Sequence, residues 1–406
     1  MYNYYRWLGL GFVLVAAVGD SYKISDYWPI GLPITIIVLA FFVLLMLRIN
    51  QISVKNLAVI VIAMMAFIYG SYKNNLYYLL QDFLPIATSI LLFICLKNIN
   101  SIDCSERLSY YTRIFLVIAS LKVFYIIIVR PLPDWGETWI SSNYILDGGF
   151  PRVMLKGSSP LFFISVVFEL INFIKNKKGS VVYLFLGFSL IVLDGSRALL
   201  AATLIPSFFV LVGAFKFNTH TVLIKIIPGV GFLLLLVAFV TSASFRSSDP
   251  NVSGEFEQVG VESVSAAYRL LEISSAIESV QNVYIGNGLG ASFITLASGS
   301  VNDNNEGIYV HSFPVWVYVK FGVLGFAIAC ILFIIFIVKL LRSIVRVKDN
   351  PELLVVNVWG IYFLSFVCAS FITNLLATFT GAIVASLLAI NFIQKRKLMT
   401  IKDCGQ

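Results

Sequence analysis

Charged residues are scarce in this chain of 406 residues: Asp, Glu, Lys and Arg make up only 12%, against 59% hydrophobic residues. A soluble protein would carry about twice that charged fraction. The mean hydropathy of the whole chain is +0.90. The composition therefore excludes an ordinary water-soluble enzyme and predicts an integral membrane protein.

Cysteine and histidine are also scarce, with five cysteines and two histidines in the whole chain. The cysteines fall in predicted cytoplasmic segments or inside hydrophobic runs, so no disulfide is expected. No CxxC motif or Cys/His cluster has the spacing of a zinc site. The residues therefore give no sign of a zinc site, and neither a metal nor an organic cofactor is predicted.

Long hydrophobic runs are what the chain has instead. About 20 apolar residues cross the hydrocarbon as a helix, because lipid cannot satisfy free backbone groups. The runs predict an all-α, polytopic fold of about twelve spans, with residues 1–406 as one integral membrane domain. The first run could also be a signal peptide, but the many runs after it favour a span. The predicted spans lie near 6–18, 29–47, 57–70, 77–96, 112–130, 160–174, 181–194, 198–215, 223–240, 312–338, 353–372 and 374–393.

The net charge of +8 is distributed unevenly. Lysines and arginines cluster in alternate short segments between the spans and near the C-terminus, and short cytoplasmic loops collect such residues. Both termini are therefore predicted to be cytoplasmic. The same pattern argues for contact with membrane lipids and against a nucleic-acid partner, which would need one continuous basic surface.

Two longer segments are predicted on the outer side. The first large periplasmic loop covers 131–160, and a long periplasmic loop covers 241–310 between spans nine and ten. Within the second, apolar residues recur at helical spacing over Val261–Val280, which predicts a helix lying along the membrane surface. This loop is acidic overall, so its few cations require a reason.

Three arginines are candidate ligands for phosphate, because a guanidinium group binds phosphate oxygens through a planar pair of N–H donors. Arg197 begins span eight, and Arg246 and Arg269 lie in the long loop. Each has a simpler alternative. Arg197 could pair with Asp194, Arg246 could anchor the interface, and Arg269 could pair with Glu272 or another nearby acid.

His311 stands where the long loop enters span ten. Imidazole exchanges a proton readily near neutral pH, so this residue is a candidate catalytic base, with a structural hydrogen bond as the alternative. Arg152 and Lys156 in the first large loop could contact a second lipid-linked chain or only lipid headgroups. Cations and one base at a membrane surface suit chemistry on a lipid-linked anionic substrate.

Other residues within the predicted spans and loops have open roles. Lys122, Glu169 and Lys320 are costly in lipid, so they line a route for a charged headgroup or pair with opposite charges. Gly286-Asn-Gly-Leu-Gly290 predicts a tight turn that permits close backbone approach. Gly322 and Gly325 are predicted helix-packing positions.

Several short motifs together resemble a known family. Gly286-Asn-Gly-Leu-Gly290, His311-Ser-Phe and Phe321-Gly-Val-Leu-Gly325 are similar to the signature of the O-antigen polymerase and O-antigen ligase superfamily. Ser196-Arg197-Ala-Leu-Leu resembles its upstream element. An Arg-x10-Gly pattern common in polymerases of this group is missing, since neither Arg152, Arg246 nor Arg269 has glycine at that spacing.

The resemblance implies a GT-C-like fold and a metal-independent, inverting glycosyltransferase. Its donor would be an undecaprenyl-diphosphate-linked oligosaccharide at the periplasmic face of a bacterial inner membrane. Carried over, Arg197 and Arg269 would bind the diphosphate, and His311 would activate the acceptor hydroxyl.

Three functions follow as hypotheses. The first is a polymerase that joins lipid-linked repeat units of an O-antigen or capsule, for which a chain-length regulator is a candidate protein partner. The second is an O-antigen ligase that transfers the finished glycan to lipid A–core. The third, from another class, is a transporter of lipid-linked oligosaccharides, which would need charged residues through the depth of the membrane.

Overall fold

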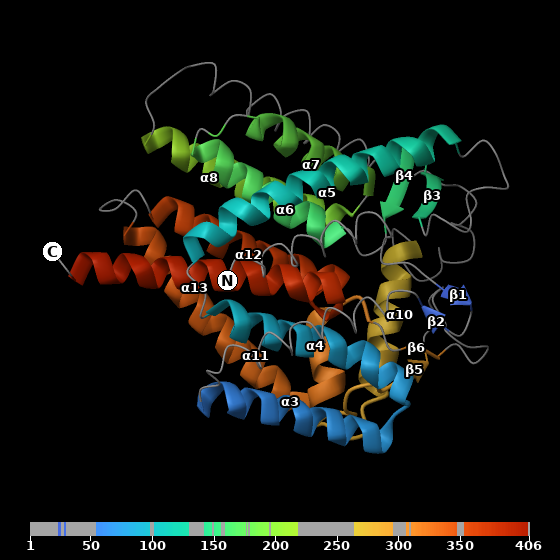
Figure 1. Ribbon diagram of the computed structural model, residues 1–406. Coiled ribbons are helices and arrows are strands. Elements are labelled where there is room, and N and C mark those ends of the chain that lie inside the picture. Colours follow the sequence, from blue (N-terminus) through green and yellow to red (C-terminus); the bar gives the residue numbers. More distant parts are fainter. Residues whose placement is uncertain are drawn as a thin grey trace.

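The computed structural model is mainly helical (Figure 1). It describes residues 23–25, 28–29, 54–97, 101–129, 142–147, 150–155, 159–175, 177, 179–194, 196–217, 264–294, 306–307, 310–346 and 353–404.

The described helices follow the hydrophobic runs. They are α3 (Val54–Lys73), α4 (Leu76–Lys97), α5 (Ser101–Val129), α6 (Ser159–Ile174), α7 (Ser180–Asp194), α8 (Arg197–Phe217), α10 (Val264–Glu278), α11 (Phe313–Val345), α12 (Leu353–Thr373) and α13 (Phe379–Cys404), with a short 3-10 turn, η3 (Leu375–Ala377). Each predicted span among these residues coincides with a helix. The predicted spans at 6–18 and 223–240, and nearly all of 29–47, lie outside the described residues.

Four helical segments are long and apolar enough to cross a membrane: Leu76–Ile94, Leu108–Tyr125, Phe313–Val345 and Leu354–Thr373. Shorter apolar helices accompany them, and large apolar side chains of α3 and α11 are exposed on the protein surface. Such exposure is costly in water and expected in lipid. The prediction of a mainly helical fold with several helices apolar enough to span a membrane is therefore confirmed, while the count of twelve spans and the GT-C-like arrangement stay predictions.

Three pairs of short antiparallel strands accompany the helices: β1 (Lys23–Ser25) with β2 (Trp28–Pro29), β3 (Ser142–Asp147) with β4 (Phe150–Leu155), and β5 (Phe293–Ile294) with β6 (Glu306–Gly307). The β3–β4 hairpin departs from the purely helical fold that the sequence predicts. Asp147 pairs with Phe150, and the two residues between them are glycines. A Gly-Gly pair is a common two-residue hairpin loop, so the sequence held a signal for this turn.

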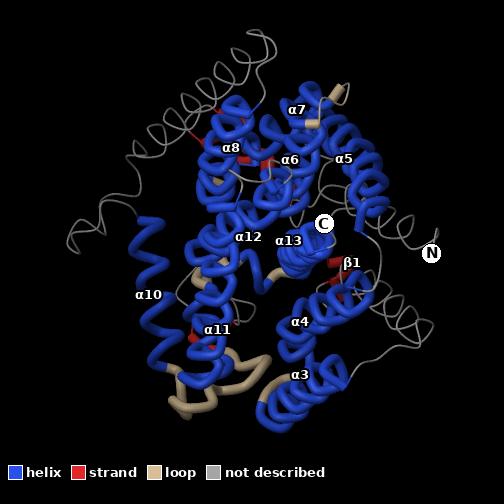
Figure 2. The backbone as a smooth tube through the Cα atoms, turned by 90° about the vertical axis from the view of Figure 1, so that its left-hand side faces the viewer, coloured by secondary structure: helices blue, strands red, loops and turns tan. Residues whose placement is uncertain are grey.

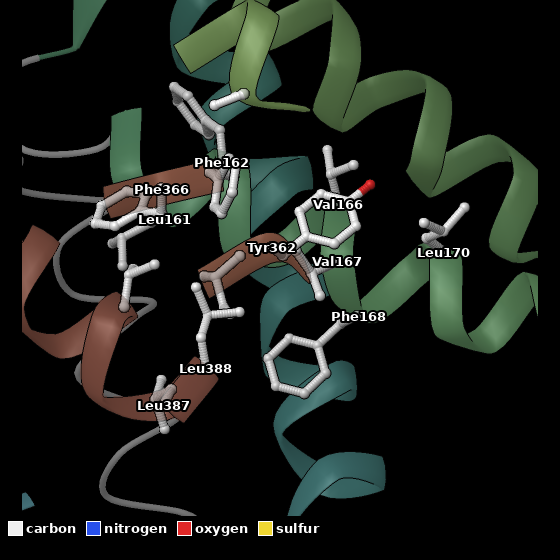
Figure 3. Packing of buried hydrophobic residues seen from close by; sticks show 14 of the residues in the cluster. Leu161, Phe162, Val166, Val167, Phe168, Leu170, Tyr362, Phe366, Leu387 and Leu388 are labelled. Carbon is white, nitrogen blue, oxygen red and sulfur yellow. The ribbon is translucent and has the colours of Figure 1, made fainter. Parts of the chain in front are cut away.

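The larger hydrophobic core lies mainly between α5, α6, α7, α8, α12 and α13, and it includes Leu91 and Leu92 of α4 and Leu340 of α11. Every residue of α6 from Pro160 to Asn172 is buried, and its aromatic side chains meet those of α12 (Figure 3). Phe168 packs edge-on against Trp359 with ring centroids 5.1 Å apart, and Phe163 contacts Tyr362 and Phe366. This core holds α6 at the centre of the helical bundle.

A smaller core lies beneath the candidate site and joins α3, α4, α10 and α11. Its buried members are Leu79, Ala276, Leu289, Phe293, Val310, Trp316, Val317 and Val319. Helix α10 crosses the ends of the longer helices on the side where the three strand pairs lie (Figure 1), and it runs beside α11 (Figure 2). The C-terminus lies on the opposite side.

Candidate functional site

His311 and Glu272 form the centre of the candidate site. The Nδ1 atom of His311 lies 2.7 Å from Oε2 of Glu272, and the same carboxylate oxygen accepts a hydrogen bond of 3.2 Å from the backbone N–H of His311. The side chain of Glu272 is only 4% exposed, whereas that of His311 is 37% exposed. One partner is thus anchored inside the protein and the other reaches its surface.

The N-terminal end of α11 places His311. Asn374, which separates α12 from η3 in a left-handed conformation (φ 48°), donates a hydrogen bond of 2.7 Å from Nδ2 to the carbonyl of Val310. Ser312 is the N-cap of α11, and Pro314 follows in its first turn, where a missing N–H costs nothing. His311 is therefore held from α10 and from the end of α12.

A glycine-rich loop from Asn282 to Ala291 packs into a break in α11. Gly322 interrupts the helix with φ 63° and ψ −163°. Asn287 and Gly288 donate their backbone N–H groups to the carbonyls of Val319 and Lys320, at 2.8 and 3.1 Å. On the other side of the break, the N–H groups of two α11 residues bond back to the loop. The loop therefore replaces helical hydrogen bonds that the break leaves unmade.

The glycines of this loop have the conformation that the sequence predicts. Gly286, Gly288 and Gly290 all have positive φ, between 73° and 84°. A Cβ at Gly286 would lie 2.6 Å from the backbone nitrogen of Gly322. The predicted tight turn with close backbone approach is confirmed. The prediction that Gly322 is a helix-packing position is wrong, because Gly322 is where α11 breaks to admit the loop.

A buried ion pair fastens the loop beneath the site. Lys320 Nζ lies 2.6 Å from Asp82 Oδ2 of α4, and it donates a second hydrogen bond of 2.7 Å to the carbonyl of Ala291. Asp82 also accepts hydrogen bonds from the backbone N–H of Gly290 and from the indole of Trp316, at 2.7 and 3.2 Å. The side chains of Lys320 and Asp82 are 0% and 6% exposed. This network satisfies both charges and links α4, the loop and α11.

Two of the three charged residues left open by the sequence have partners in the structure. Lys320 pairs with Asp82, and Glu169 receives two hydrogen bonds from Arg113, at 2.8 and 2.9 Å. The alternative in which these residues pair with opposite charges is therefore the one that the structure supports. Lys122 lies in α5, where its side chain is partly buried.

The structure describes Arg269 and Arg197, two of the predicted phosphate-binding residues, but it does not show whether they approach His311. Arg269 lies on α10 one turn before Glu272, with a half-buried side chain, and no ion pair between described residues includes it. Arg197 is the first residue of α8. Asp194, its predicted alternative partner, accepts a hydrogen bond of 2.8 Å from Ser159. Convergence of Arg197 with His311 stays a prediction.

Three further residues were predicted to contact the substrate or lipid: Arg152, Lys156 and Arg246. Arg152 belongs to β4, where its backbone pairs with that of Ile145. Lys156 and Arg246 lie outside the described residues. No group of three or more His, Cys, Asp or Glu residues in the described part of the chain is placed to hold a metal ion.

Glu272 is the candidate site residue whose pairing with His311 the sequence does not predict. The sequence suggests it only as a partner of Arg269. The sequence carried no distinguishing signal, because Glu272 lies on the face opposite Leu270 and Ile277, where a surface helix ordinarily carries acids. An acid on the inner face of a helix that flanks a histidine is a candidate for orienting that histidine.

The chemistry of the pair follows from its geometry. A carboxylate next to Nδ1 favours the tautomer in which Nδ1–H donates to it, which leaves the lone pair on Nε2 to accept a proton. The carboxylate also stabilises the imidazolium that forms after that transfer. The arrangement can therefore act as a general base at the end of a set of apolar helices.

No model of a known protein family matches the chain, and no curated protein matches it either.

Proposed function

We propose that this protein is a membrane glycosyltransferase that polymerises polyprenyl-diphosphate-linked oligosaccharide repeat units at the outer face of a bacterial inner membrane. The observation that supports the proposal is the His311–Glu272 pair at 2.7 Å, set at one end of helices apolar enough to cross a membrane. Both termini would then be cytoplasmic, and the loop that carries Glu272 would face the periplasm.

The proposed reaction breaks one bond and forms one bond at the anomeric carbon of the donor. The acceptor hydroxyl oxygen attacks that carbon while His311 Nε2 takes the hydroxyl proton. The bond between the anomeric carbon and the diphosphate oxygen breaks, its electron pair stays on that oxygen, and polyprenyl diphosphate is released. Arg197 and Arg269 would neutralise the growing charge of the diphosphate, which is where fixed cations contribute most. Direct displacement inverts the anomeric configuration, and no metal takes part in these steps.

The central experiment incubates the purified protein in vesicles with lipid-linked repeat units and separates the products by size. The His311→Ala variant is expected to lose about 10²–10⁴-fold in rate, the usual contribution of a general base. The Glu272→Gln variant is expected to lose about 10–100-fold, because an orienting partner is lost and the base remains. A Glu272→Asp variant should recover part of that loss.

Glu278→Gln is the matched control, because Glu278 lies on the same helix with an exposed side chain. It should retain full activity. Equal activity of His311→Ala and the unaltered protein would remove the proposed base.

The acceptor distinguishes polymerase from ligase. Ladders of increasing length without lipid A–core support polymerisation. Transfer that occurs only when lipid A–core is added supports the ligase. A third outcome would instead support the transporter: intact lipid-linked oligosaccharide moves across the vesicle membrane and its length does not change.

A further inference from the structure

Helix α10 exposes leucine and isoleucine side chains and buries a glutamate, which is unusual for a helix in water. Its exposed positions are Leu270, Leu271, Ser274, Ile277 and Glu278, which follow one another at helical spacing on a single face. Leu270 is 59% exposed. The opposite face carries Ala276 and the buried, charged Glu272. A helix that turns leucine and isoleucine outward and a carboxylate inward is suited to a surrounding that is not water.

The loop after α10 continues this apolar surface. Val283, Tyr284 and Ile285 are consecutive and exposed, with Tyr284 at 72%. Consecutive exposed apolar residues in a loop are unfavourable in water. Two of them are joined directly to α11, because Val323 and Leu324 donate their backbone N–H groups to the carbonyls of Val283 and Tyr284, at 2.8 and 3.2 Å.

The neighbouring surface of α11 indicates what covers this patch. From Val323 to Val345, α11 exposes mainly large apolar side chains, and the exposed charges Lys339 and Arg342 lie near its C-terminal end. This segment alone is roughly 35 Å long at about 1.5 Å per residue, enough to cross the ~30 Å hydrocarbon core. Before the break at Gly322, by contrast, Trp316, Val319 and Lys320 are buried in protein. The break therefore falls at the level where α11 leaves the protein and meets lipid.

We infer that the patch formed by Leu270, Leu271, Ile277 and Val283–Ile285 is seated in the outer boundary of the bilayer, against the acyl chains of membrane lipids. The patch is continuous with the lipid-facing side of α11 through the two backbone hydrogen bonds. Lipid then lies against one face of α10, and His311 lies at the other face, beside Glu272. The inference concerns a surface, and it holds whatever reaction the site carries out.

Depth-dependent fluorescence quenching tests this inference on the full-length protein. Single cysteines replace Leu271, Ile277 or Tyr284 in a cysteine-free background and are labelled with an environment-sensitive dye. The protein is placed in vesicles of phosphatidylethanolamine and phosphatidylglycerol that carry a nitroxide either near the headgroup or near the chain end. Two reference positions are Ile331→Cys in the exposed middle of α11 and Asn75→Cys in the exposed polar turn between α3 and α4.

We expect labels at the three patch positions to be quenched several-fold more strongly by the shallow nitroxide than by the deep one. The label at Ile331 should show the reverse order, and the label at Asn75 should be quenched mainly by iodide in the water. Iodide quenching of the patch labels as strong as that at Asn75 would overturn the inference. Protection from both iodide and nitroxide would overturn it as well, because a protein surface would then cover the patch.

Discussion

The two hydrophobic cores of this protein are built on different principles. The larger core consists of apolar and aromatic side chains that pack against each other between α5, α6, α7, α8, α12 and α13. The smaller core, under His311, contains few buried apolar side chains and depends on a buried ion pair and on a loop bonded into a broken helix. The larger core packs the helices against each other, whereas the smaller core fixes the position of the glycine-rich loop against α4 and α11.

This difference has a physical consequence for tolerance to mutation. Side-chain packing adapts to a small loss because neighbours can shift, whereas a buried charge or a backbone junction has few alternative arrangements. We expect the smaller core to be the more sensitive of the two to conservative changes. Four substitutions test that comparison.

The largest effect is expected for Lys320→Met, which keeps the length of the side chain and removes its charge. Asp82 would remain buried with a charge that Lys320 no longer balances, a change that costs about 3–5 kcal/mol in buried pairs. Denaturant unfolding in mixed micelles measures this loss. Adding Asp82→Asn should restore part of the stability, because no unbalanced charge then remains. If the double variant lost as much unfolding free energy as the two single variants added together, the stabilising interaction between Lys320 and Asp82 would be contradicted.

The next effect is expected for Gly286→Ala. The new Cβ would lie 2.6 Å from backbone atoms of α11, and the residue would have to keep φ at 73°. Strain and displacement together should cost about 2–5 kcal/mol.

Gly179→Ala is the matched control for that change, since Gly179 also has positive φ (79°) but its nearest neighbour to a new Cβ is Tyr183 at 4.0 Å. It should lose only about 1–2 kcal/mol. Equal losses for the two variants would mean that the close approach between loop and helix contributes nothing.

The features that could be predicted from sequence were those set by local pattern. Continuous apolar runs located the helices, the glycine spacing located the turn at Gly286–Gly290, and the composition indicated a membrane protein. His311 was identified because it stands where a polar segment meets an apolar one. Each of these inferences uses only residues close together in the chain, where periodicity reports the surroundings.

The features that could not be predicted depend on distant packing. Several acids in the long loop were equivalent in sequence, and only the placement of α10 selects Glu272 as the partner of His311, which lies 39 residues away. The pairing of Lys320 with Asp82 likewise requires α4 and α11 to be neighbours. Gly322 lies two residues after Lys320 in an otherwise apolar run, and the sequence does not distinguish a glycine at a helix-packing position from one at a break.

A smaller effect is expected for Asn374→Gly, which tests the hydrogen bond from Asn374 to Val310, the residue before His311. Glycine tolerates the left-handed conformation of this position, so the change removes mainly the hydrogen bond to the buried carbonyl of Val310. An unsatisfied buried group costs about 1–3 kcal/mol. Asn374→Ala should lose more than Asn374→Gly, because alanine also resists positive φ. The reverse order would mean that the left-handed conformation does not constrain this position, and unchanged stability of Asn374→Gly would mean that the hydrogen bond contributes nothing.

The smallest effect is expected in the larger core, for Tyr362→Phe. The Tyr362 hydroxyl is hydrogen-bonded to Oγ of Ser207, which also donates to the carbonyl of Thr203 at 2.6 Å. After the substitution Ser207 keeps that bond, and the phenylalanine ring keeps its contact with Phe163, so the loss should be only about 0.5–1.5 kcal/mol. A loss as large as that of Lys320→Met would erase the distinction between the two cores, because the larger one would then also depend on individual polar contacts.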